Sequence, residues 1–334
     1  MTAAGRIPVL VVAGFLGSGK TSLLRRMLTG VPDTAVIVNE FGAVGLDHDL
    51  LRACEERVEL VGGGCACCTK REDLVRVLRE LLDDRDRGRT QLRRVVIETS
   101  GLADPAPIVF TITHDPMLRH HFEVERLIVA VDAVNGSAQL VAHPEVAKQV
   151  LVADELVITK VDLVDAGAGE AIAGQLASLN PAASIRTALH GVLDEHELHP
   201  AKTGGDSNTG GLGAGSPDHP GLGNHTDDVR SLQVATQEPV DWLAFAIWLS
   251  MLLHARGEQV LRVKGLLELD DGTLVSVNGV QHVMHTPEHI PREAIPQPAR
   301  SIVFITRGLD VDRLQDSLDT FQRLARAGGA VRGR

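Results

Sequence analysis

Aromatic residues are scarce in this sequence: they make up 3% of its 334 residues, and tyrosine is absent. Proteins that bind single-stranded nucleic acid stack the bases on aromatic side chains beside basic ones, and seven phenylalanines with two tryptophans do not supply such a patch. Basic charge is also lacking, because the formal net charge is −11. The composition therefore excludes nucleic acid and anionic membrane surfaces as partners.

Long apolar runs are missing as well. No stretch reaches the roughly 18 apolar residues that a membrane span needs, and the N-terminus, MTAAGRIPVLVVAG, lacks the long apolar region and cleavage site of a secretory signal. We therefore expect a cytoplasmic protein with no membrane partner, in which cysteines stay reduced. Three of the four cysteines, Cys65, Cys67 and Cys68, lie close together, which favours metal or redox chemistry over a disulfide framework.

The arrangement of apolar residues predicts the fold class. From Ile7 to about Thr187, short apolar runs alternate with helical patterns, which is typical of an α/β domain with a mostly parallel sheet covered on both faces. The expected strands begin at Pro8, Ala35, Arg94, Arg126, Glu155 and Ser184. The clearest helical stripe consists of Leu74, Val77, Leu78, Leu81 and Leu82.

The chain length predicts about two domains. We assign residues 1–189 to the α/β domain and residues 190–229, which are rich in glycine and polar residues, to a flexible linker. Residues 230–334 should form a smaller α+β domain. Its expected elements are a strand near Leu232, a helix from Val240 to His254, two strands around an Asp-Asp-Gly turn, the strand SIVFIT, and a final helix from Asp310 to about Ala327.

A phosphate-binding loop follows the first strand. The segment GFLGSGKT has the spacing G-x-x-x-x-G-K-[ST], with a strand before it and a helical stripe after it. Glycines let successive backbone N–H groups converge on phosphates, the lysine contacts the β- and γ-phosphates, and the threonine hydroxyl contacts Mg²⁺. The alternative is an incidental glycine-rich turn. The nucleotide contacts expected here are Gly14, Gly17, Ser18, Gly19, Lys20, Thr21 and Ser22.

A candidate base-reading loop, TKVD, ends a later strand. The carboxylate of Asp162 can accept hydrogen bonds from the N1–H and the exocyclic amine of guanine, whereas adenine would oppose it with a further acceptor. The methylene stem of Lys160 could cover the purine. Thr159 stands where such loops often have asparagine, so a solvated turn remains the alternative.

The segment IETSGLADP predicts the hydrolytic part of the site. Glu98 ends a buried strand, where its carboxylate can reach Mg²⁺ through water or position the attacking water. Gly101 can donate its backbone N–H to the γ-phosphate. In the alternative interpretation, Glu98 only caps the next helix.

The segment GGGCACC predicts a metal site. Thiolates are soft ligands suited to Zn²⁺, Cu(I) and related ions, and Glu40 or water could add a ligand to Cys65, Cys67 and Cys68. Structural cysteines and a redox pair are the alternatives. The thiolates favour zinc, while Co²⁺ or Fe²⁺ stay open because geometry and availability also decide.

Together, the motifs GFLGSGKT, NEFG, GGCACC, ETSGLADP, VDA, TKVD, RVKG and SIVFITRGLD resemble those of the CobW family of metal-handling GTPases. The resemblance spans both domains and implies a P-loop GTPase domain with a CxCC metal site, followed by a smaller C-terminal domain. It implies that Lys20 and Thr21 hold the phosphates and Mg²⁺, that Glu98 serves hydrolysis, and that the cysteines bind the transported ion. Some members carry a histidine-rich stretch where this chain has its glycine-rich linker.

The resemblance implies a GTPase that loads or delivers a divalent metal, foremost zinc, to a client metalloprotein. We expect GTP to order residues 39–49 and 100–105 and to position the cysteines, and hydrolysis to release them. The alternatives are an assembly GTPase similar to a nitrile hydratase activator, and a metal buffer or sensor with little turnover. A homodimer is a further expectation that no residue pattern demonstrates.

Overall fold

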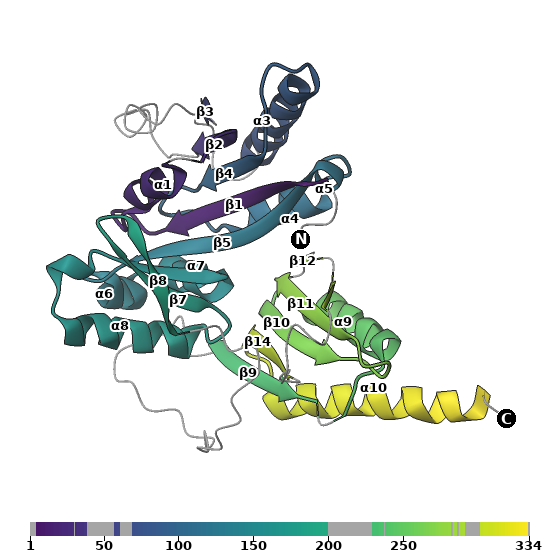
Figure 1. Cartoon of the computed structure of the whole chain (residues 1–334). Coiled ribbons are helices and arrows are strands. Elements are labelled where there is room, and N and C mark those ends of the chain that lie inside the picture. The colour runs from purple at the N-terminus through teal and green to yellow at the C-terminus, as the bar shows by residue number, and fades with distance from the viewer. Residues whose placement is uncertain are drawn as a thin grey trace. The chain divides into compact units, whose positions relative to one another are not determined.

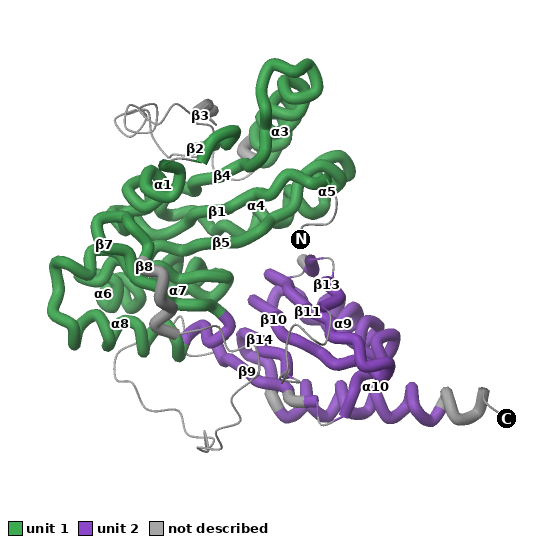
Figure 2. Tube along the Cα trace, in the orientation of Figure 1, with its two compact units in different colours: residues 1–178, 183–200 green, residues 179–182, 201–334 purple. Residues whose placement is uncertain are grey.

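The computed structural model describes residues 5–29, 31–38, 57–60, 69–199, 229–236, 238–281, 283–285, 287–290 and 301–332. The chain divides into two compact units (Figure 2): residues 1–178 with 183–200, and residues 179–182 with 201–334. The boundaries that we assigned at residues 189 and 229 stay predictions. One described strand, at residues 192–199, lies inside the span assigned to the linker.

The first unit contains an eight-stranded sheet with the order β3-β2-β4-β1-β5-β6-β7-β8 (Figure 1). Neighbouring strands are parallel except β7 and β8, which confirms the predicted mostly parallel sheet. The strands are β1 (Ile7–Gly14), β2 (Thr34–Val38), β3 (Arg57–Leu60), β4 (Arg94–Glu98), β5 (Phe122–Asp132), β6 (Glu155–Thr159), β7 (Ser184–Leu189) and β8 (Val192–His199).

Helices cover both faces of this sheet, and two of its inner strands are buried along their whole length. Every residue of β2 and of β6 is buried, so both faces of these strands are covered, as in other parallel sheets. Leu23, Leu24 and Leu28 of α1 share one core with residues of six strands. The helices are α1 (Lys20–Leu28), α3 (Thr69–Asp86), α4 (Ala106–His114), α5 (Leu118–His121), α6 (Gly136–Ala142), α7 (Pro144–Val152) and α8 (Ala166–Leu179), with a 3₁₀ turn, η1 (Val161–Leu163).

The parallel arrangement positions the candidate site. Strands β1, β4, β5 and β6 run side by side in the same direction, so their carboxyl ends meet at one edge of the sheet. In open α/β sheets, ligands bind outside this edge. Gly14, Glu98, Asp132 and Thr159 are the last residues of these four strands.

The second unit is an antiparallel sheet with helices. The strand order is β12-β11-β10-β14-β9, with β13 paired to β11. The predicted Asp-Asp-Gly turn joins β10 to β11. The elements are β9 (Val229–Ala235), α9 (Trp242–Arg256), β10 (Val260–Glu268), β11 (Leu274–Val280), β12 (Val283–Met284), β13 (Glu288–Ile290), β14 (Ser301–Arg307) and α10 (Val311–Arg332).

Helix α9 shows how local sequence sets this unit's packing. The side chain of Asp241 accepts a 2.8 Å hydrogen bond from the Ala244 amide, which caps the helix at its N-terminus. Phe245, Trp248 and Leu249 then enter the core of the unit. The indole N–H of Trp248 donates to the Ser317 hydroxyl of α10 at 2.8 Å. Across the described ranges, neither α9 nor another helix combines the length and apolar character needed to cross a bilayer.

Candidate nucleotide site

The phosphate loop joins β1 to α1 through a backbone that only glycine can adopt at its first position. Gly14 has a φ of 144°, and a Cβ atom there would lie 2.5 Å from the Ala130 carbonyl oxygen and 2.6 Å from Ser18 Oγ. Gly17 and Gly19 also have positive φ, and helix α1 begins at the next residue, Lys20. The loop therefore lies at the N-terminus of α1, where backbone N–H groups favour an anion.

Polar side chains of the loop fit a phosphate ligand. The ammonium group of Lys20 donates to the carbonyl oxygens of Gly14 and Phe15, at 2.9 and 3.0 Å, and so lies over the loop. The hydroxyl of Ser18 is fully buried and has no hydrogen-bond partner within the described part of the chain. A buried hydroxyl normally has a partner, and a phosphate oxygen would supply one.

The magnesium residues predicted from the sequence lie together. Thr21 Oγ1 donates a 2.8 Å hydrogen bond to Glu98 Oε1, although 77 residues separate them in the chain. Glu98 is 3% exposed. A hydroxyl and a carboxylate are hard oxygen ligands of the kind that Mg²⁺ prefers, so these two residues fit the ion. Ser22 follows Thr21 and is exposed.

The loop after β4 contacts the phosphate loop closely at Gly101. A Cβ atom at this position would lie 2.7 Å from the Leu16 amide nitrogen and 2.9 Å from Leu16 Cα, so a larger residue would displace one of the two loops. The buried side chain of Gln149, on α7, donates to the carbonyl oxygens of Gly101 and Ala103 at 3.2 and 2.8 Å. Gln149 was not singled out from the sequence, because its position within an apolar helical stripe carries no local signal.

The candidate base-reading loop is bonded to the phosphate loop. Thr159 Oγ1 donates a 2.7 Å hydrogen bond to the Ser18 carbonyl oxygen. The next residue, Lys160, has a left-handed backbone with a φ of 58°. Its ammonium group pairs with Asp132 Oδ2 at 2.8 Å. In the sequence, Asp132 belongs to the motif VDA, but no functional role was predicted for it.

Asp162, the residue expected to read guanine, lies in η1 with its side chain 26% exposed. The Nδ1 atom of His190, which follows β7, lies 3.8 Å from Asp162 Oδ2. His190 is the first residue of the span that we assigned to the linker, and no role was predicted for it; in the structure it directly follows β7 and so lies near the candidate base-reading loop. A carboxylate with an accessible edge is available to donors of a purine base.

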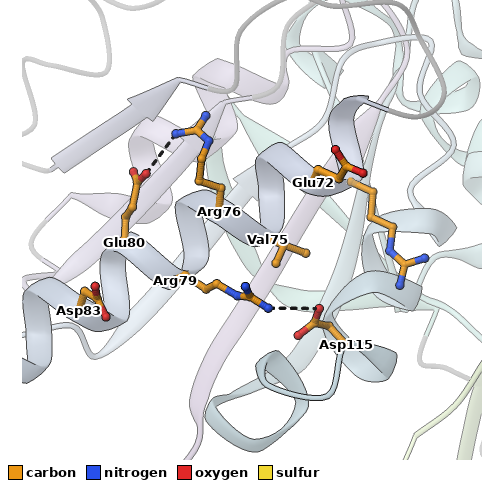
Figure 3. A pocket seen from close by; sticks show the side chains of 8 residues that line it. Glu72, Val75, Arg76, Arg79, Glu80, Asp83 and Asp115 are labelled. Carbon is orange, nitrogen blue, oxygen red and sulfur yellow. Dashed lines mark hydrogen bonds and ion pairs between the residues drawn. The ribbon is translucent and has the colours of Figure 1, made fainter.

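The predicted transition-metal ligands, Glu40, Cys65, Cys67 and Cys68, lie outside the described residues. Helix α3 begins at Thr69, directly after the last cysteine. Figure 3 shows a groove along α3 that is lined by charged side chains, with Arg79 facing Asp115 at 3.9 Å and Arg76 bonded to Glu80. The groove contains none of the predicted nucleotide residues.

The site thus combines three parts at one edge of the sheet: a loop suited to phosphate, a Thr-Glu pair suited to Mg²⁺, and a carboxylate beside a lysine suited to a base. This arrangement defines a P-loop nucleotide-binding protein.

Residues 8–187 match the model of the CobW/HypB/UreG nucleotide-binding domain, and residues 229–322 match that of the cobalamin synthesis protein cobW C-terminal domain. The chain belongs to the CobW/HypB/UreG family.

Three comparisons with proteins named as zinc chaperones or GTPases each cover most of the chain. It is 34% identical over 266 residues to the zinc chaperone YjiA of Escherichia coli K12, an alignment that covers 79% of this chain and 82% of the relative. It is 28% identical to the zinc-regulated GTPase metalloprotein activator 1 of Schizosaccharomyces pombe, covering 83% and 76% of the two chains. The crystal structure of Zn(II)-bound YjiA GTPase from E. coli superposes with a TM-score of 0.67 at 27% identity, covering 95% of this chain and 99% of that one.

These findings confirm the predicted fold class and family: a P-loop GTPase with a mostly parallel sheet, accompanied by a smaller C-terminal domain. The roles that we assigned to individual residues remain predictions.

Proposed function

We propose that this chain is a GTP-dependent zinc chaperone that hydrolyses GTP and hands Zn²⁺ to a client metalloprotein. The observation that carries the proposal is the Thr21–Glu98 hydrogen bond, because it brings a P-loop threonine and a buried carboxylate together beside the phosphate loop. The names of the E. coli and S. pombe relatives support zinc as the transported metal. Co²⁺ and Fe²⁺ are alternatives that metal analysis of the purified protein would separate.

The residues around the phosphate loop would hold and cleave GTP. Lys20 would leave the carbonyl oxygens of Gly14 and Phe15 for the β- and γ-phosphates, and Ser18 would donate its buried hydroxyl. Mg²⁺, when bound, would neutralise charge on the phosphates beside Thr21 and Glu98. The Glu98 carboxylate would orient the attacking water, and the Gly101 N–H would contact the γ-phosphate.

The second half of the proposal concerns zinc. Cys65, Cys67 and Cys68 would bind the ion as thiolates, with Glu40 or water as a further ligand. A reducing, cytoplasmic compartment keeps these thiols available. GTP would favour the metal-binding arrangement of the cysteine segment, and hydrolysis would favour release to the client.

The experiment is GTP turnover with and without Zn²⁺ in the wild-type chain, in Cys67→Ala and in Cys54→Ala. Cys54 lies outside the CxCC motif, so its variant is the matched control. We expect zinc to change turnover in the wild type and in Cys54→Ala, and to have no effect on Cys67→Ala, whose metal-free turnover stays normal. A Cys67→Ala variant that responds to zinc as the wild type does would overturn the proposed metal site.

A further inference from the structure

Asp132 is a buried carboxylate beside the candidate base-reading loop. It ends β5, and its side chain is 2% exposed. Oδ1 accepts hydrogen bonds from the Val134 and Asn135 amides at 2.8 and 3.4 Å. Oδ2 accepts from Asn135 Nδ2 at 3.0 Å and from Lys160 Nζ at 2.8 Å. Such a set of donors stabilises the ionised carboxylate.

Hydrogen bonds of the neighbouring backbone also fix the main chain at Lys160. The Ala133 amide donates to the Thr159 carbonyl oxygen at 3.0 Å, and the Thr159 hydroxyl donates to the Ser18 carbonyl oxygen. The Lys160 carbonyl oxygen accepts from the Leu163 amide at 3.0 Å. Both ends of the lysine, its backbone and its ammonium group, are therefore held. The methylene stem between them has little freedom left.

We propose that Asp132 is a positioning residue for purine binding: it holds the ammonium group of Lys160 so that the lysine stem forms an apolar shelf for the base. The inference rests on the proposed guanine site at Asp162. A free lysine side chain loses much rotamer entropy when a ligand orders it. Here the ion pair orders the stem before the nucleotide arrives, so less affinity is lost on binding.

The shelf and the base-reading carboxylate should differ in what they recognise. The stem of Lys160 would contact the face of the ring, which guanine and xanthine share. Asp162 would contact the edge, where guanine has an exocyclic amine and xanthine a carbonyl. Loss of Asp132 should therefore weaken GDP and xanthosine diphosphate (XDP) by the same factor, whereas Asp162→Asn should shift preference toward XDP.

The test measures the dissociation constants of GDP and XDP by calorimetry for the wild type, Asp132→Asn, Lys160→Met and the double variant. Asparagine keeps the size of Asp132 and an oxygen for the loop amides, but not the charge. We expect about tenfold weaker binding of both nucleotides to Asp132→Asn. We expect the double variant to regain most of the loss, because the apolar methionine stem needs no counter-ion.

If the Asp132 carboxylate served only to fix the turn at residues 134–135, the double variant would lose as much GDP affinity as Asp132→Asn. This result would overturn the inference. Equal GDP affinity of Asp132→Asn and the wild type, within twofold, would do so too. If Asp132→Asn folds poorly, Lys160→Ala tests the same inference. Removing the lysine stem should weaken GDP binding by about the same factor as we expect for Asp132→Asn. A wild-type chain that does not bind GDP would instead refute the guanine site itself.

Discussion

The hydroxyl of Thr21 donates to the carboxylate of Glu98 across 2.8 Å, joining the first turn of α1 to the end of β4. This bond brings two motifs that are far apart in the sequence into one candidate magnesium site. Glu98 is also buried, with 3% of its surface exposed, so its side chain has little room to move away from Thr21.

Replacing Glu98 with glutamine should lower GTP turnover on the order of a hundredfold, because glutamine keeps the shape of the side chain but loses the charge that would orient water and Mg²⁺. Steady-state phosphate release measures this effect. Glu125→Gln changes a carboxylate on β5 that is 38% exposed, and we expect wild-type turnover from it. Turnover of Glu98→Gln within threefold of the wild type would exclude Glu98 from hydrolysis.

Gly101→Ala should destabilise the protein by about 1–3 kcal/mol and reduce GTP turnover, because the new Cβ would lie 2.7 Å from the Leu16 amide nitrogen. Gly174, in α8, has open space around the same hypothetical atom. Gly174→Ala should therefore stabilise the chain by roughly 0.5–1 kcal/mol. Urea unfolding of both variants measures the contrast, and equal effects would show that the loops do not meet as described.

Gln149→Met should loosen the loop after β4. The substitution keeps the length of a buried side chain but removes both hydrogen bonds to the Gly101 and Ala103 carbonyl oxygens. We expect a loss of about 1–3 kcal/mol and faster hydrogen exchange at residues 100–105. Gln175→Met, in α8, retains those bonds and serves as the control. Unchanged exchange in Gln149→Met would mean that other contacts fix the loop.

Asp132 should make stability depend on pH in the acid range. Burial alone would raise the pKa of Asp132, but hydrogen bonds from Lys160, Asn135 and Val134 outweigh burial and hold the pKa below its ordinary value. The stabilisation is therefore present above the unfolded-state pKa of about 3.9 and is lost as pH falls through the lower folded-state pKa.

In urea unfolding, the difference in free energy between the wild type and Asp132→Asn should consequently be larger at about pH 6 than at about pH 2.5. The same difference at both values would show that the carboxylate has an ordinary pKa in the folded chain.

Much of the fold was predictable because buried parallel strands are continuous apolar runs. The expected strands that begin near Pro8, Ala35, Arg94, Arg126, Glu155 and Ser184 correspond to β1, β2, β4, β5, β6 and β7. Strands β3 and β8 were missed. Both lie at edges of the sheet, and their sequences, RVEL and VLDEHELH, are polar, as edge strands often are.

The candidate site was predictable where its chemistry follows a local spacing, as in the phosphate loop. The contacts of Asp132 with Lys160 and of Gln149 with Gly101 join residues 28 and 48 positions apart, so only the folded sheet brings them together. No local pattern in the sequence marks such pairs.

The proposed chaperone activity requires that the binding of nucleotide and the binding of zinc are coupled. A zinc titration of the wild-type chain, loaded with Mg²⁺ and either GDP or a non-hydrolysable GTP analogue, measures this coupling. We predict tighter zinc binding with the analogue, and an equal factor by which zinc strengthens binding of the analogue relative to GDP. Identical zinc affinities in the two nucleotide states would show that nucleotide and zinc binding are not coupled.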